Sequence, residues 1–149
     1  MALPSTRDRV PLHTASDTNQ QIRREIVQRV RDLQGQPGAI AARLRALDEE
    51  WDIELAIEAN ASTLAFIGVA LGYFVDPAWL ILPALVTAFL FQHALQGWCP
   101  PVPVLRRLGF RTAYEIEEER HALKALRGDY RSVGAGRDGA EGAVAAAEA

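Results

Sequence analysis

The sequence predicts an all-α fold: a two-span transmembrane helical hairpin with cytoplasmic amphipathic helices before and after it. Three observations support this class. In the 149-residue chain, apolar residues recur at helical spacing in the segments before and after the hairpin. Residues 59–75 and 77–104 contain no charged side chain, and Asp76 alone separates these runs. The connection over residues 75–78 is so short that two helices joined by it must be antiparallel.

The first part of the chain divides into a tail and a helix. Residues 1–16 contain Pro4 and Pro11 but no periodic pattern, so we expect a disordered N-terminal tail. Thr18 and Gln21 have the spacing of a capping box, in which each side chain accepts from the backbone N–H of the other residue. They predict the start of a helix whose apolar face repeats at helical spacing: Ile22, Ile26, Val30 and Leu33.

Residues 17–58 are predicted to form amphipathic cytoplasmic helices. Gly35, Pro37 and Gly38 end the first, because proline disfavours the α conformation of the residue before it. The second helix has an apolar stripe, and no Gly or Pro separates it from residue 59. We therefore expect one long helix that continues into the first span. The stripe needs cover and is the predicted partner-binding face: Ile40, Leu44, Leu47 and Trp51.

The transmembrane hairpin is predicted over residues 59–98. Its first run, residues 59–75, is at the lower limit for crossing a hydrocarbon core about 30 Å thick. The second run, residues 79–98, would rise about 28 Å as a helix. A hairpin buried in a soluble all-α domain is the alternative, but two consecutive uncharged runs favour the membrane. Amphipathic aromatic residues near the ends of the runs are the predicted interface anchors: Tyr73, Trp79 and Trp98.

Small residues repeat along both runs and predict close helix packing. The pair Gly68 and Gly72 is a GxxxG motif, which permits close approach of two backbones in lipid. The second run offers a matching small face. The pattern leaves open whether the packing is within one hairpin or between two protomers. The predicted membrane-packing residues are Ala61, Ala65, Gly68, Gly72, Ala84 and Ala88.

Basic residues determine the expected orientation. Arg43 and Arg45 precede the hairpin, Arg106 and Arg107 follow it, and residues 75–78 contain no basic side chain. By the positive-inside rule, both termini should lie on the cytoplasmic side of a bacterial inner membrane. The N-terminal residues lack the apolar core of a secretory signal, so the hairpin is the expected targeting element.

Residues 99–130 are predicted to form an interfacial segment and a short cytoplasmic helix. Three prolines follow Cys99 closely and should keep that segment extended. Thr112 begins a second capping box, and Gly128 is suited to end the helix. Residues 131–149 are rich in Gly and Ala and are expected to form a flexible tail.

The exit from the second run carries a short family pattern. It consists of Gly97-Trp98-Cys99-Pro100, then Val104-Leu105, then Leu108-Gly109. Residues 59–110 thereby resemble the YgaP-like inner-membrane domain family. The resemblance implies a two-helix membrane hairpin. In that family the hairpin occurs alone or fused to a rhodanese domain, and the general function of the family is not established. Pro101 and the long N-terminal helices depart from the pattern, and the sequence shows no rhodanese domain, so sulfur transfer is not implied.

Composition and charge exclude several functional classes. A net charge of −3, from 16 basic and 19 acidic residues, lacks the cationic surplus of a nucleic-acid binder. A single cysteine excludes an internal disulfide and a multi-cysteine zinc site. We expect no enzyme and no cofactor. Cys99 is the one weak catalytic candidate, because Arg106 and Arg107 could lower its pKa; the alternative role is a small residue at a turn.

Two further motifs are weaker. His93 lies inside the second run and could ligate haem or relay a proton, although a hydrogen bond to a neighbouring carbonyl is the favoured interpretation. Glu118 and His121 have the Glu-x-x-His spacing of di-iron bundles, and Glu54 and Glu58 could add carboxylates from a second protomer. Charged helices produce such spacings by chance, so no metal site is predicted.

These features together predict a structural or binding subunit of the inner membrane that acts through helix packing. Its expected partners are the lipid bilayer and either further copies of itself or a larger membrane complex. A thiol or sulfur-transfer accessory role for Cys99 is the alternative. A small oligomeric pore or transporter is a third possibility, with Gln92, His93 and Gln96 along its path, but uncharged spans disfavour it.

Overall fold

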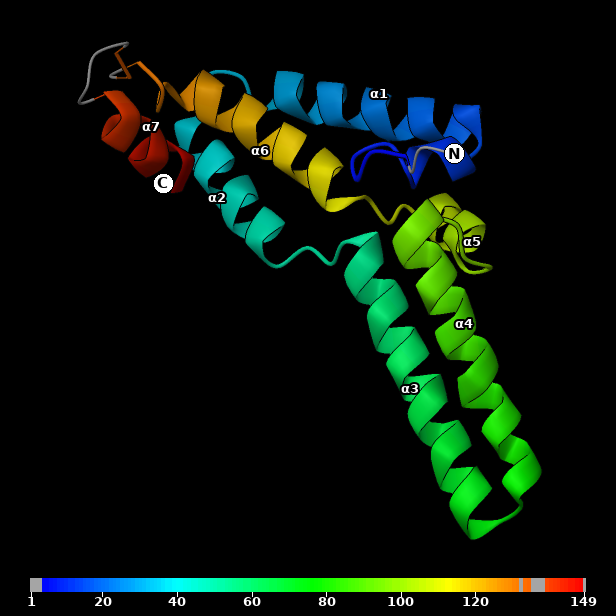
Figure 1. Cartoon of the computed structure of the whole chain (residues 1–149). Coiled ribbons are helices and arrows are strands. Elements are labelled where there is room, and N and C mark those ends of the chain that lie inside the picture. Colours follow the sequence, from blue (N-terminus) through cyan, green and yellow to red (C-terminus); the bar gives the residue numbers. More distant parts are fainter. Residues whose placement is uncertain (1–3, 132, 135–138, 149) are drawn as a thin grey trace. The chain divides into compact units, whose positions relative to one another are not determined.

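The computed structural model describes residues 4–131, 133–134 and 139–148. Within these ranges the chain is helical and contains no strand (Figure 1). Two compact units make up the chain. The first, called the hairpin unit here, comprises Met1–Ile22 and Trp51–Ala113, and the second, called the polar unit, comprises Arg23–Glu50 and Tyr114–Ala149.

The N-terminal segment is packed, so the predicted tail over residues 1–16 is wrong for its described part. A 3-10 helix, η1 (Pro11–His13), follows Val10. The Val10 side chain is 1% exposed and lies in a core cluster with Ile53 and Val102. A single apolar anchor has no period, and for that reason the sequence pattern did not reveal it.

Helix α1 (Ser16–Asp32) begins earlier than the predicted capping box. The backbone N–H of Asn19 already donates to the Ala15 carbonyl at 3.1 Å, so Thr18 lies inside the first turn. The Asn19 side chain donates instead to the carbonyl of Pro11 at 2.9 Å, which ties η1 to the helix. The apolar face holds as predicted, since Ile22 and Ile26 are buried.

The predicted continuous helix through residue 59 is two helices, α2 (Pro37–Asp48) and α3 (Ile53–Phe74). Asp52 starts the second, because its carboxylate accepts the backbone N–H of Leu55 at 2.7 Å. The apolar stripe therefore ends at Leu47, and Trp51 is 55% exposed. The break contains neither Gly nor Pro, which are the breakers the sequence argument relied on.

Helices α3 and α4 (Ile81–Gln96) form an antiparallel hairpin, as predicted (Figure 1). They are joined through the 3-10 helix η2 (Pro77–Leu80), which Asp76 caps by accepting the N–H of Ala78 at 2.8 Å. Because α3 begins six residues before residue 59, its 22 residues rise about 33 Å, beyond the lower limit that the sequence indicated.

The segment after Cys99 contains a short helix, α5 (Val102–Arg107), so the prediction that its prolines keep it extended was wrong. Pro101 and Pro103 occupy its cap and first turn. Proline is accepted there, because the first N–H groups of a helix have no partner within it. Val102 is fully buried and fastens α5 to the core of the hairpin unit.

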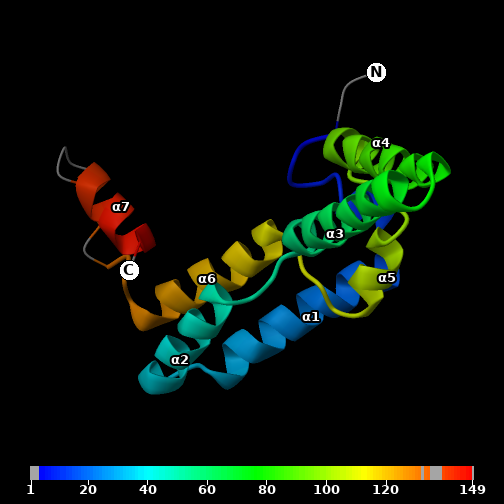
Figure 2. The same ribbon diagram turned by 90° about the horizontal axis from the view of Figure 1, so that it is seen from below.

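The polar unit is built on α2 and α6 (Ala113–Arg127), which lie side by side in Figure 2. Helix α6 starts after Thr112 and ends before Gly128, whose φ is +95°, as the sequence predicted. The stripe of α2 is covered by this chain and is not open to a partner. Its core cluster consists of Ile40, Leu44, Leu47, Ile116 and Leu123.

A last helix, α7 (Gly139–Glu148), occupies most of the predicted flexible tail. Alanine has the highest helix propensity, and the alanine-rich sequence forms a helix without large side chains. Ala146 is buried, and the Lys124 ammonium donates to the carbonyl of Ala147 at 2.5 Å. Residues 132, 135–138 and 149 of the predicted tail lie outside the described residues.

Candidate functional site

The outer surface of the hairpin is the most unusual feature of the described chain. Two helical stretches each contain an 18-residue window apolar enough to cross a membrane: Pro37–Phe74, which includes α2 and α3, with a window of mean hydropathy 1.5, and Pro77–Gln96, with a window of mean hydropathy 1.7. Only 17% and 6% of their apolar windows are buried within the chain. The core helix of a soluble protein would be mostly buried. Several large side chains are 66–82% exposed: Phe66, Tyr73, Phe74, Ile81 and Phe91.

The GxxxG motif packs within the hairpin, which resolves one alternative. Gly68 is buried against α4, and Gly72 is buried against Leu80 of η2. A Cβ atom on Gly68 would lie 2.5 Å from Cδ of Pro83, and one on Gly72 would lie 2.6 Å from Cδ2 of Leu80. Side chains at these positions would push the helices apart. The two glycines therefore allow the close approach of α3 and α4.

The alanines of the predicted packing set differ in burial between the two helices. Ala61 and Ala65 are half-buried on α3, whereas Ala84 and Ala88 are exposed on α4. The predicted small face of the second run therefore does not pack within the hairpin, and packing between two protomers stays a prediction. Pro83 of α4 and Leu80 of η2 are the large residues that contact the glycines of α3, so the close approach at these two positions needs small residues on α3 only.

Aromatic side chains lie near both ends of the hairpin, at the predicted positions. Tyr73 and Trp79 flank the turn and are 82% and 45% exposed. At the opposite end Trp98 follows α4, and its ring centroid lies 6.3 Å from that of Phe89. An apolar ring with one polar atom suits the boundary between hydrocarbon and water.

Residues 5–14, called the N-terminal strap here, close the end of α4. The Arg9 guanidinium donates to the carbonyl of Ala94 at 3.0 Å. Gly97 ends α4 with φ +76°, and a Cβ atom there would lie 2.4 Å from the carbonyl carbon of Arg9. Only glycine satisfies both the left-handed conformation and this contact. The first residue of the family-like pattern is thus explained by the strap.

Arg106 is a structural residue of the hairpin unit, although it also follows the hairpin closely. Its side chain is 1% exposed and donates to the carbonyl of Phe110 at 3.1 Å and to Oδ1 of Asn19 at 2.9 Å. Nearby, the backbone N–H of Ile53 donates to the carbonyl of Arg111 at 2.8 Å. These bonds join α1, α3 and the chain after α5 into one base for the hairpin.

Cys99 lies inside this base rather than at an open surface. The thiol is 6% exposed and packs in the cluster that contains Val10, Ile57 and Val102. Burial raises the pKa of the Cys99 thiol above its ordinary value. The expected lowering by arginine was wrong, because burial dominates and the Arg106 guanidinium bonds to Asn19 and Phe110 instead.

We expect the purified protein in mild detergent to alkylate slowly at Cys99. A raised pKa leaves less thiolate at neutral pH, and the thiolate is the reactive form. The rate of reaction with a small maleimide should therefore keep rising with pH after the rate of a free cysteine peptide has levelled off. If the Cys99 rate levels off at a lower pH than the rate of the peptide, the burial argument is contradicted.

His93 is a buried polar residue in the last turn of α4. It is 5% exposed, and neither ring nitrogen has a hydrogen-bond partner among the described residues. Oε2 of Glu54 is also buried without a hydrogen-bond partner among the described residues, and the charge of Arg9 acts on both Glu54 and His93. The expected bond from His93 to a carbonyl is therefore not present. Sequence reasoning missed this grouping, because its members are far apart along the chain.

An apolar groove opens between α3 and α4 above Cys99. Its space is about 240 Å³. The polar residues in its lining are Asn60 and Cys99, and Pro100 and Pro101 also line it. The apolar walls come from both helices of the hairpin: Ile57, Ala61, Leu64, Val86, Phe89 and Leu90.

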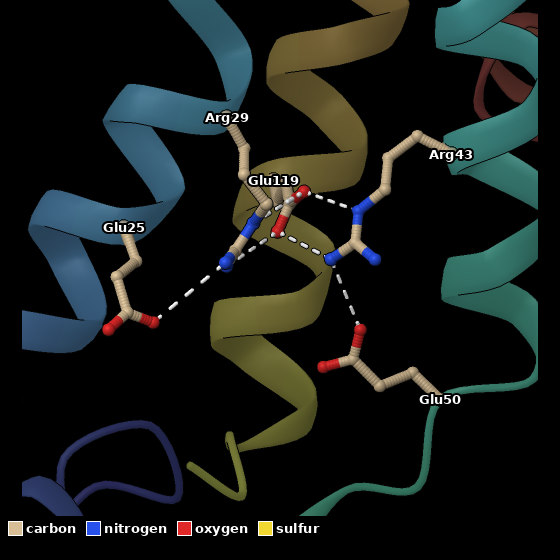
Figure 3. Close-up of polar contacts among 5 residues, drawn as sticks. All are labelled: Glu25, Arg29, Arg43, Glu50 and Glu119. Atoms are coloured by element: carbon tan, nitrogen blue, oxygen red, sulfur yellow. Dashed lines mark hydrogen bonds and ion pairs between the residues drawn. The ribbon is translucent and has the colours of Figure 1, made fainter. Parts of the chain in front are cut away.

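The polar unit contains a buried ionic cluster that the sequence analysis missed. Glu119 is fully buried and accepts from Arg43 at 2.8 and 3.2 Å and from Arg29 at 3.3 and 3.4 Å. Figure 3 shows its carboxylate between α1 and α2, with Glu25 and Glu50 on the outer sides of the two arginines. The cluster fixes three helices by charge pairing.

The Glu-x-x-His motif beside this cluster binds other side chains. Glu118 pairs with Arg23 at 2.8 Å, and Nδ1 of His121 lies 2.7 Å from the Tyr130 hydroxyl. Across the described residues, no group of three or more His, Cys, Asp or Glu side chains is arranged to hold a metal ion. The structure therefore does not bring Glu118 and His121 into a ligand set.

The strongest candidate site is thus the apolar hairpin together with the base that closes it. The hairpin has an exposed apolar surface. At its base lie the groove between α3 and α4 and the buried side chain of His93. No family model, curated protein or solved structure matches the chain.

Proposed function

We propose that the chain is an integral protein of a bacterial inner membrane, anchored by the α3–α4 hairpin and serving as a structural or binding subunit. The exposed apolar surface of the hairpin carries this proposal. Burying apolar surface stabilises by about 25 cal/mol per Å², so a hairpin covered with exposed Phe, Tyr, Ile and Leu side chains is costly in water. Lipid removes this cost.

The construction of the hairpin agrees with a bilayer environment. Both segments are helical, so their backbone groups bond internally, as the hydrocarbon region requires. Asp76, the one charged residue between 59 and 104, lies at the turn, where a short crossing hairpin reaches water. Basic residues on the chain before and after the hairpin favour cytoplasmic termini.

The binding role is assigned to surfaces that the chain leaves open. The stripe residues Ile40, Leu44 and Leu47 are covered by α6 and do not serve it. Trp51 is 55% exposed just before α3, and Leu55 is 45% exposed in its first turn. Both lie at the aqueous end of the anchor, where self-association or docking on a larger membrane complex would place a contact. The buried thiol of Cys99 favours this role over thiol chemistry.

Membrane insertion is tested by fractionation and labelling. The chain should stay in the pellet after alkaline carbonate extraction of bacterial membranes. In a Cys99→Ser background, Asp76→Cys should react with a membrane-impermeant maleimide in intact spheroplasts. Gly38→Cys is the matched control: Gly38 is an exposed glycine of α2 and should react only after lysis. A folded, monodisperse protein in the detergent-free supernatant would contradict the proposal, and labelling of Gly38→Cys in intact spheroplasts would contradict the orientation.

A further inference from the structure

The groove between α3 and α4 deepens the proposed function, on which this inference rests. We propose that the groove holds one acyl chain of a phospholipid from the surrounding bilayer. The lipid would be a bound component of the hairpin rather than part of its passing solvent shell.

The shape of the hairpin creates this space at its base. Near the turn, Pro83 and Leu80 occupy the space beside Gly68 and Gly72, so the two arms of the hairpin are in close contact. About two turns from Gly68 toward the base, α3 and α4 leave about 240 Å³ open, and Ala61 is one of the residues that line this space. An apolar cavity of about 150 Å³ is sufficient to bind benzene, so this groove accommodates a segment of a hydrocarbon chain.

The lining favours hydrocarbon over water. A bound water needs two to four polar partners, and the groove offers only Asn60 and Cys99 among its lining residues. Leu64 and Phe89 line the groove and are also 42% and 38% exposed on the outside of the hairpin. The groove is therefore continuous with the apolar face proposed to meet lipid, and a chain can enter it from that face without crossing a polar barrier.

The arrangement of charge at the base matches the order of groups in a phospholipid. Pro101 lines the groove, and α5 continues from it for six residues, about 9 Å, to the exposed Arg107. An acyl chain in the groove places its phosphate toward this end of the hairpin. Arg107 carries the charge that attracts it, whereas Arg106 is buried and bonded to Asn19.

A second copy of the chain is the rival occupant. An isologous dimer would need a ridge on the same face to fill the groove of its partner. A flexible acyl chain needs no such complementary surface, and lipid surrounds the groove at far higher concentration than a second copy does. The experiment below separates the two.

Native mass spectrometry of the full chain, extracted from membranes in a mild detergent, measures bound phospholipid directly. The wild-type chain should retain one phospholipid. Ala61→Phe fills the groove and should lower the retained fraction at least about fivefold. Ala84→Phe adds the same ring at an exposed alanine of α4 outside the lining and should leave retention unchanged.

Three results would overturn the inference. They are the absence of lipid on the wild-type chain, equal retention by Ala61→Phe, or a wild-type dimer that Ala61→Phe dissociates, which would assign the groove to a second copy. If Ala61→Phe fails to insert, Arg107→Gln decides, because it leaves the hairpin packing intact. It should reduce the share of anionic lipid among the retained molecules, and an unchanged share would also overturn the inference. Release of the chain into the supernatant by alkaline carbonate, by contrast, would remove the proposed function itself.

Discussion

Replacing Glu119 with alanine is expected to lower the free energy of local unfolding of α2 and α6 by about 2–3 kcal/mol. The substitution leaves the guanidinium groups of Arg29 and Arg43 without the carboxylate that both contact. A fully buried pair loses about 3–5 kcal/mol when one partner is removed. The two arginines here are 34% and 25% exposed, so water partly replaces the lost contact.

Hydrogen–deuterium exchange, followed by mass spectrometry of peptides from α2, α6 and the hairpin, measures this loss. Exchange should accelerate in α2 and α6 and stay unchanged in α4. Glu118→Ala is the matched control on the neighbouring residue. Its partner Arg23 is 68% exposed, so the loss should be below about 1 kcal/mol. Equal acceleration by both variants would show that the buried cluster does not stabilise the polar unit.

The hairpin was predictable because its signals are local. Two uncharged runs, a short connection and Asp76 between them are visible in one stretch of sequence, and helical period then determines the rest. The same holds for α6, which Thr112 and Gly128 delimit as expected. In each case the residues that specify the element are neighbours along the chain.

Several of the wrong predictions have the opposite cause, because the residues concerned are far apart along the chain. Val10 is buried by residues more than forty positions away, and Glu119 meets arginines 76 and 90 positions away. Such contacts have no signature in a single sequence. The partner-binding stripe failed for this reason as well, because its cover on α6 lies far along the chain. The break before α3 is a different case, in which an aspartate cap acted without Gly or Pro.

The second large effect is expected at the contact between the strap and the end of α4. Gly97→Ala must hold alanine at φ +76°, which costs about 1–2 kcal/mol. It must also place a Cβ atom 2.4–2.5 Å from the carbonyl carbon and oxygen of Arg9, and backbone cannot yield as a side-chain end can. We therefore expect the strap to detach and Val10 to leave the core.

Detachment has two measurable consequences in the full chain. Trypsin should cleave after Arg9 at least about tenfold faster than in the wild-type protein, because the population of the open form rises. Cys99 should react faster with maleimide, since Val10 belongs to the cluster that buries it. Gly109→Ala is the matched control, with φ +93° and no described atom within 4 Å of the added Cβ. It imposes the backbone strain without the contact, so slow cleavage and a shielded thiol are expected. If both variants behave alike, strain rather than the strap explains the glycine at position 97.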